Sequence, residues 1–209
     1  KGVGMKNVIV AANWKLNKGP KETQTFFKEF LSILPNEKQE QVIFFVPATN
    51  LDAAARALEN TKIRFGSQNC YSHVSGAFTG ETSAQVVKEM GAQLVLLGHS
   101  ERRQIFKETD EFIAAKGKLV QSLGLTPMVC VGETLEEREA GKTEKVCETQ
   151  LTAFINSIDV TKEWVVAYEP VWAIGTGKVA SLAQVSEAHT HIRKVITSKG
   201  GSSAVPILY

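Results

Sequence analysis

The most restrictive feature of this chain is the regular alternation of short apolar runs with longer stretches of helical period. The apolar runs are rich in β-branched residues, as strands buried on both faces of a sheet are. They predict strands over 7–12, 41–46, 63–67, 94–97, 126–131, 164–167 and 205–209. Strands that alternate with helices build a parallel sheet from βα units. We therefore expect an α/β fold and, because no linker or repeat divides the chain, a single domain over 1–209.

The stretches between the strands predict amphipathic helices. The first begins near Pro20, a residue suited to a first helical turn, and its inward face carries Phe26, Phe27, Phe30, Leu31 and Leu34. We expect Asn50 to cap the next helix. Further helices are predicted over 83–90, 110–123, 144–158 and 181–198. In the last of these, His189 and His191 are interpreted as ordinary helix residues and not as ligands.

Composition narrows the range of partners. The 209 residues include 24 basic and 22 acidic side chains, a net charge of +2, which argues against nucleic acid or a membrane surface as the main partner. No apolar run approaches the ~20 residues of a membrane helix, and we expect no leader segment. Cys70, Cys130 and Cys147 lack metal-ligand spacing and fit reduced thiols. We expect a cytoplasmic protein without a bound metal or cofactor.

A carboxylate stands at the end of the strand predicted over 164–167, directly before a loop that contains glycines. Pro170 ends the strand after Glu169, since proline has no N–H to donate to a ladder. Gly175 and Gly177 admit backbone conformations closed to other residues, which suits a loop that opens and shuts. The alternative for Glu169 alone is a solvated strand-end residue. The lid loop consists of Pro170, Val171, Trp172, Ala173, Ile174, Gly175, Thr176, Gly177 and Lys178.

Polar segments also follow two other predicted strands. Asn13-Trp14-Lys15 follows the first strand, and Gly98-His99-Ser100-Glu101-Arg102-Arg103 follows the strand over 94–97. Taken singly, such a lysine is usually a solvated cation and such a histidine a structural residue. Taken together with Glu169, they put an amide, a cation, an imidazole and a carboxylate at strand carboxyl ends. That is the face on which parallel α/β barrels carry their active sites.

These segments resemble, in order and spacing, those of the triosephosphate isomerase family. The lid run is similar nearly letter for letter, and the histidine segment matches without a departure. Gln68-Asn69, the loop 76–81 and the run 130–133 add further matches. The resemblance implies a (β/α)8 TIM barrel, which typically has about 250 residues. In the family, the residue matching Tyr209 opens a Tyr-Gly-Gly-Ser loop, so we expect the barrel here to lack its eighth βα unit.

The resemblance implies an intramolecular aldose–ketose isomerase of glycolysis and gluconeogenesis, which interconverts dihydroxyacetone phosphate and D-glyceraldehyde 3-phosphate through an enediolate. Glu169 would be the base, and His99 a neutral imidazole that polarises the carbonyl oxygen. Lys15 and Asn13 would bind the substrate and stabilise the oxyanion, and the Gly175 N–H would approach the phosphate under the closed lid. No cofactor is implied. Supporting roles fall to Glu101, Arg102 and Tyr209.

The resemblance also implies a homodimer. The loop 68–81 matches the one through which subunits of the family interlock, and its tip carries Phe78, Thr79, Gly80 and Glu81. We expect Arg102 to pair with Glu81 as a structural support. Oligomers of this kind usually have closed twofold symmetry. A simple surface loop is the alternative.

Two other functions stay open at this point. If the chain ends at Tyr209, the open edges of the first and seventh strands would favour an inactive truncated barrel fragment or an interaction module. Another phosphosugar enzyme on the same barrel is disfavoured, because the fold alone permits it but three separate site segments do not. An isomerase assay on triose phosphates distinguishes these alternatives.

Overall fold

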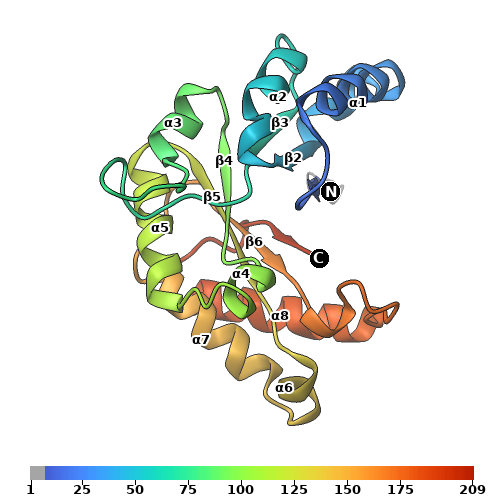
Figure 1. Cartoon of the computed structure of the whole chain (residues 1–209). Coiled ribbons are helices and arrows are strands. Elements are labelled where there is room, and N and C mark those ends of the chain that lie inside the picture. Colours follow the sequence, from blue (N-terminus) through green and yellow to red (C-terminus); the bar gives the residue numbers. More distant parts are fainter. Residues whose placement is uncertain (1–7) are drawn as a thin grey trace. The chain divides into compact units, whose positions relative to one another are not determined.

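The computed structural model describes residues 8–209, which fall into two compact units (Figure 1). The first unit extends to Val95 and the second runs from Leu96 to Tyr209. Each unit alternates strands with helices, as the sequence predicts. The predicted strand over 7–12 begins at Asn7, which lies outside the described residues, as does the segment 1–6.

Parallel strands form the centre of the first unit. Its elements are β1 (Val10–Asn13), α1 (Pro20–Ile33), η1 (Asn36–Gln41), β2 (Val42–Val46), η2 (Ala48–Asn50), α2 (Leu51–Ala57), β3 (Arg64–Ser67), α3 (Ala84–Glu89) and the start of β4 (Leu94–Leu97). β1 pairs with β2, β2 with β3 and β3 with β4, all in parallel. All five residues of β2 are buried, so this strand carries the core of the unit.

An aromatic cluster fixes α1 against β2. The rings of the cluster lie 5.0 to 5.8 Å apart between centroids in their contacting pairs. Its members are Trp14, Phe26, Phe27, Phe30 and Phe44. Such pairs contribute about 0.5–1.5 kcal/mol each beyond the area they bury. Because Trp14 belongs to the cluster, the segment that carries its neighbours Asn13 and Lys15 is anchored in the core.

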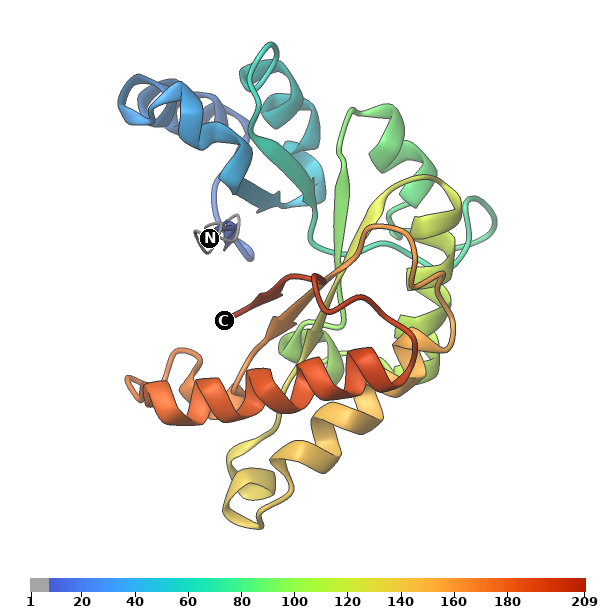
Figure 2. The same ribbon diagram turned by 180° about the vertical axis from the view of Figure 1, so that it is seen from behind.

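The second unit follows the same plan. Its elements are the end of β4, α4 (Ser100–Gln104), α5 (Asp110–Ser122), β5 (Thr126–Val131), α6 (Leu135–Glu139), α7 (Thr143–Ile155), β6 (Val165–Tyr168), η3 (Val171–Ala173), α8 (Leu182–Ser198) and β7 (Ile207–Leu208). β5 pairs with β6 and β6 with β7, both in parallel. All six residues of β5 are buried. Helices α7 and α8 pack against each other (Figure 2).

The predicted elements agree with these bounds to within a few residues, and two details differ. Asn50 precedes α2 as predicted, but its side chain does not cap the helix. Its Nδ2 donates instead to the Lys18 carbonyl at 2.9 Å, so it ties the β1–α1 loop to the start of α2. Helix α6 was not predicted, although Thr134 and Glu137 form a capping box at its start.

The three cysteines, all among the described residues, are buried thiols outside any disulfide. Among the described residues, no helix has both the length and the apolar character that a membrane crossing requires.

Candidate active site

His99 and Glu169 face each other in the second unit, each placed by the end of a buried strand. β4 ends at Leu97 and β6 ends at Tyr168. The distance from His99 Nε2 to Glu169 Oε1 is 3.2 Å. The two side chains are only 8% and 18% exposed, respectively, so water screens the pair weakly. The structure thus brings together two residues that lie 70 positions apart in the sequence.

The backbone around His99 fixes the orientation of its ring. Gly98 has a left-handed φ of 68°, which lets the chain turn sharply out of β4. His99 then occupies the N-cap position of α4, and its Nδ1 accepts a hydrogen bond from the Glu101 N–H at 3.3 Å. A nitrogen that accepts this bond carries no proton, so the neutral ring has its proton on Nε2. The protonated Nε2 then lies 3.2 Å from Oε1 of Glu169.

Glu101 supplies a second neighbour of the same nitrogen. Its Oε2 lies 3.4 Å from His99 Nδ1. This carboxylate oxygen can bind only a ring that is protonated at Nδ1, whereas the backbone N–H can bind only one that is not. The backbone bond belongs to the neutral ring, and the carboxylate contact would replace it if the ring became an imidazolium ion.

One oxygen of the Glu169 carboxylate is held by a hydrogen bond, and the other faces His99. Oε2 accepts a hydrogen bond from the Ser100 N–H at 3.2 Å, while Oε1 faces His99. Its own N–H donates to the Val131 carbonyl at 2.8 Å, which continues the β5–β6 ladder by one residue. Burial and the nearby Glu169 charge raise the pKa of the Cys130 thiol well above its usual value. The thiol beside the carboxylate therefore stays neutral.

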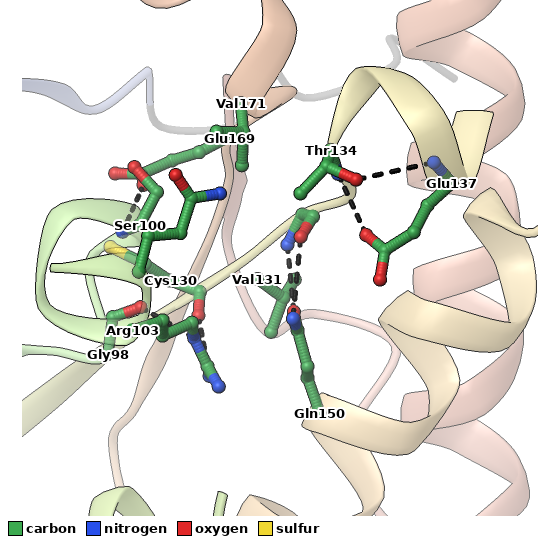
Figure 3. Close-up of a pocket in the computed structure, with 12 residues that line it drawn as sticks. Gly98, Ser100, Arg103, Cys130, Val131, Thr134, Glu137, Gln150, Glu169 and Val171 are labelled. Carbon is green, nitrogen blue, oxygen red and sulfur yellow. Dashed lines mark hydrogen bonds between the residues drawn. The ribbon is translucent and has the colours of Figure 1, made fainter. Parts of the chain in front are cut away.

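A pocket of about 170 Å³ borders this carboxylate (Figure 3). Its lining includes Glu169, Ser100, Cys130 and Arg103. Arg103 donates from Nε to the Gly98 carbonyl at 2.8 Å and from Nη2 to the Cys130 carbonyl at 3.1 Å. One guanidinium thus ties the end of β4 to the end of β5, which limits how far His99 can move from Glu169.

Beyond Glu169, the lid loop is attached to a buried carboxylate that the sequence interpretation did not assign to the site. Glu133 has no exposed surface, and it accepts hydrogen bonds from the Trp172 indole at 3.0 Å and from the Tyr168 hydroxyl at 3.1 Å. Arg138 forms an ion pair with Glu133, with Nη1 3.0 Å from Oε1, and its guanidinium lies over the Trp172 ring. Burial and the Glu133 charge raise the pKa of Tyr168, so the hydroxyl stays a donor.

The remainder of the lid is open. Gly175 and Gly177 have left-handed φ values of 66° and 74°, and both are exposed. No atom outside their immediate chain neighbours lies within 4 Å of the place where a Cβ would stand on either. The lid therefore combines a firm attachment at Trp172 with a tip that few contacts restrain.

In the first unit, Asn13 and Lys15 form a compact turn after β1. Asn13 Oδ1 accepts a hydrogen bond from the Lys15 N–H at 3.0 Å, and Lys15 has a left-handed φ of 53°. Gln68 Nε2 donates to the Lys15 carbonyl and to the Phe45 carbonyl, each at 3.0 Å. These bonds hold a strained backbone in place. The meeting of this turn with His99 and Glu169 stays a prediction.

Residues predicted to support the site or the dimer have contacts of their own. Arg102 donates to Glu108 at 2.6 Å within the second unit, and its predicted pairing with Glu81 stays untested. The tip residues 78–81 are exposed. The ring of Phe78 packs on Tyr71 at 4.5 Å between centroids, so the loop is internally ordered. Tyr209 is 60% exposed.

The chain is similar to known proteins over most of its length. A sequence model of the family described as "Triosephosphate isomerase" matches residues 8–209. The triosephosphate isomerase of Bdellovibrio bacteriovorus is 56% identical over 201 residues, covering 96% of this chain and 83% of the relative. That of Lactobacillus delbrueckii subsp. bulgaricus is 47% identical over 190 residues (90% and 75%), and that of Psychromonas ingrahamii 46% over 209 residues (98% and 84%).

These matches confirm the resemblance seen in the strand-end motifs and, with it, the predicted α/β barrel class and the prediction of an isomerase. The matched region includes every candidate site residue. This chain belongs to the triosephosphate isomerase family.

Proposed function

We propose that this chain interconverts dihydroxyacetone phosphate and D-glyceraldehyde 3-phosphate, the aldose–ketose isomerisation of glycolysis and gluconeogenesis. The observation that carries the proposal is the pair formed by the Glu169 carboxylate and the His99 Nε2–H, 3.2 Å apart between Nε2 and Oε1. Proton transfer between two neighbouring carbons needs a base for the carbon-bound proton and a donor for the carbonyl oxygen. This pair supplies both.

Glu169 acts as the base. Its carboxylate takes the proton from one carbon of the triose and returns it to the neighbouring carbon, so no net proton is gained or lost. A positioned general base of this kind typically contributes about 10²–10⁴ in rate. The Ser100 N–H binds the carboxylate, and His99 lies beside it.

His99 stabilises the oxygen that becomes negative. Its Nε2–H donates to the carbonyl oxygen of the substrate as the enediolate forms. The Glu101 N–H bound to Nδ1 holds the ring in the Nε2–H tautomer, so the donor is a neutral imidazole. The isomerisation also requires the hydroxyl proton to move from one oxygen of the enediol to the other, while Glu169 returns the carbon-bound proton.

Lys15 and Asn13 would bind the substrate phosphate and the developing oxyanion. The fixed backbone of their turn supports this role, because the main chain that carries both side chains needs no further ordering when substrate binds. The lid would bring the Gly175 N–H to the phosphate and exclude water from the enediol phosphate. Its attachment at Trp172 supports a closure that is confined to the open tip.

We also propose that the protein is a cytoplasmic homodimer. Support for the dimer comes from the exposed tip 78–81, whose Phe78 ring is ordered by Tyr71 before any partner binds. Support for the cytoplasm comes from three buried cysteines that are thiols and not disulfides. Sedimentation analysis tests the dimer, and Phe78→Ser should shift the protein toward the monomer.

A coupled assay with each triose phosphate as substrate tests the activity. We expect turnover in both directions and none with pentose or hexose phosphates. An absence of turnover would instead support the inactive barrel fragment, and turnover of another phosphosugar alone would support a different enzyme on the same barrel.

A further inference from the structure

The side chain of Gln150 forms hydrogen bonds with both backbone groups of one residue of the site, Gly132. Its Oε1 accepts a hydrogen bond from the Gly132 N–H at 2.9 Å, and its Nε2 donates to the Gly132 carbonyl at 3.4 Å. Figure 3 shows the side chain reaching from α7 to the end of β5, with both bonds drawn as dashed lines. The carboxamide thus pairs with Gly132 as a neighbouring strand would.

Gly132 in turn lies directly against the main chain of Glu169. A Cβ on Gly132 would stand 1.8 Å from the Glu169 carbonyl oxygen and 2.6 Å from its carbonyl carbon. Real side-chain carbons do not approach backbone atoms that closely, so the contact requires glycine. The N–H of Glu169 is bound to Val131, the residue before Gly132. The backbone of Glu169 therefore packs against Gly132, the residue to which Gln150 is hydrogen-bonded.

Helix α7 holds the backbone of Gln150 in a fixed position. Cys147, Leu151 and Phe154 of this helix are buried to 1% exposure or less, so α7 cannot shift without disturbing the core. Gln150 itself is partly buried and lines the same pocket as Glu169. The Gln150 carboxamide thus connects α7 to Gly132, and Gly132 contacts the backbone of Glu169.

We propose that Gln150 is a positioning residue for the base Glu169. This inference rests on the proposed function, in which Glu169 moves the substrate proton. Loss of the carboxamide would let the Gly132 peptide turn and carry the Glu169 backbone with it. A misplacement of about 1 Å at a reacting group can lower the rate about 10²-fold. The binding of the phosphate should be unaffected, because it is assigned to other residues and both hydrogen bonds of the Gln150 side chain go to Gly132.

Gln150→Leu is the primary variant. It keeps the bulk of the side chain but removes both hydrogen bonds to Gly132. We expect kcat to fall about 10- to 100-fold while KM stays within about twofold, the pattern of an interaction used only in the transition state.

Gln121 provides a matched control in the same unit. Its carboxamide makes the same double contact with Asp159, donating to the carbonyl at 2.9 Å and accepting from the N–H at 2.8 Å. Asp159 lies in the α7–β6 connection, away from the site residues. Gln121→Leu should lower the melting temperature at least as much as Gln150→Leu but leave kcat at the wild-type value.

Two conservative variants complete the test. Gln150→Glu still accepts the 2.9 Å bond from Gly132, so it should recover most of the kcat lost in Gln150→Leu. Gln150→Asn is one methylene shorter and cannot reach Gly132 from the same backbone position, so its kcat should stay low. If Gln150→Leu does not fold, Gln150→Asn takes its place.

The outcomes separate the two proposals. An inactive wild-type protein would contradict the proposed function itself. An active wild type whose Gln150→Leu or Gln150→Asn variant keeps full kcat would overturn only the role of Gln150. Equal losses of kcat in the Gln150→Leu and Gln121→Leu variants would also overturn it, since general destabilisation would then explain both.

Discussion

The Trp172 indole N–H donates to the buried Glu133 carboxylate at 3.0 Å, across 39 residues of sequence. This bond connects the first turn of the lid to Glu133, the residue that follows Gly132. The Val171 N–H adds a second bond, to the Glu133 carbonyl at 3.0 Å. The lid and the base therefore share one support at the end of β5. The predictions below test this support and the chemistry assigned to it.

Replacing Glu133 should destabilise the protein strongly. Glu133→Ala removes the acceptor for Trp172 and Tyr168 and leaves the Arg138 charge without its partner. We expect the free energy of unfolding to fall by about 3–5 kcal/mol, as for one partner of a buried ion pair. Urea unfolding measures the change. Glu137→Ala, which removes only the α6 capping box, should lose about 1 kcal/mol. Equal losses in the two variants would contradict a central role for Glu133.

A methyl group at Gly132 should not be tolerated. Gly132→Ala would place Cβ 1.8 Å from the Glu169 carbonyl oxygen, and the backbone must shift to relieve the clash. We expect a loss of about 3 kcal/mol in the free energy of unfolding. Gly19→Ala is the control, because a Cβ there meets no atom nearer than 3.9 Å, and it should lose less than about 1 kcal/mol. A Gly132→Ala protein as stable as the Gly19→Ala protein would show the contact to be looser than the structure indicates.

Stability should fall at alkaline pH because of the buried thiols. Burial, with the charges of nearby glutamates, raises the pKa of the Cys147 thiol to about 12. The thiol releases its proton near pH 9 in the unfolded state but keeps it in the folded state. The unfolded state then binds fewer protons, so the free energy of unfolding falls as pH rises. The stability that the protonated thiol contributes is fully present below pH 9 and is lost toward pH 12.

The expected slope is up to about 1.4 kcal/mol per pH unit for each such thiol. Unfolding in urea at pH 8 and pH 10.5 measures it. Cys147→Ala should flatten the slope by the share of one thiol, while Cys130 and Tyr168, whose pKa values are also raised, continue to contribute. The same slope with and without Cys147 would mean that this thiol already ionises in the folded protein.

The tautomer of His99 can be observed directly. Nitrogen NMR of labelled protein should show the proton on Nε2 and a bare Nδ1, because Nδ1 accepts the Glu101 N–H. His99→Asn, which loses that donor position, should lower kcat by about 10²–10³, as for the loss of one oxyanion donor. A proton found on Nδ1 would instead assign the Glu101 carboxylate as its partner.

The sequence predicted the strands well because each one is a short, buried apolar run with little competing signal. It also identified His99 and Glu169 as strand-end residues, since parallel strands bring their carboxyl ends to one edge. It missed the pairing of Glu133 with Trp172 and of Gln150 with Gly132. These contacts depend on how α7 and the lid pack in three dimensions, and no local pattern encodes them. Asn50 was misjudged for a related reason: the bond from its Nδ2 to the carbonyl of Lys18, 32 residues earlier, sets the orientation of its side chain.

The central claim is that Glu169 is the base. Glu169→Gln keeps the size of the side chain and can still accept the hydrogen bond from the Ser100 N–H, but it cannot take up a proton. We predict that kcat falls by about 10²–10⁴ with only a modest loss of stability. Glu148→Gln, the same change at an exposed position of α7, should keep wild-type turnover. Near-normal kcat in the Glu169→Gln protein would contradict the account.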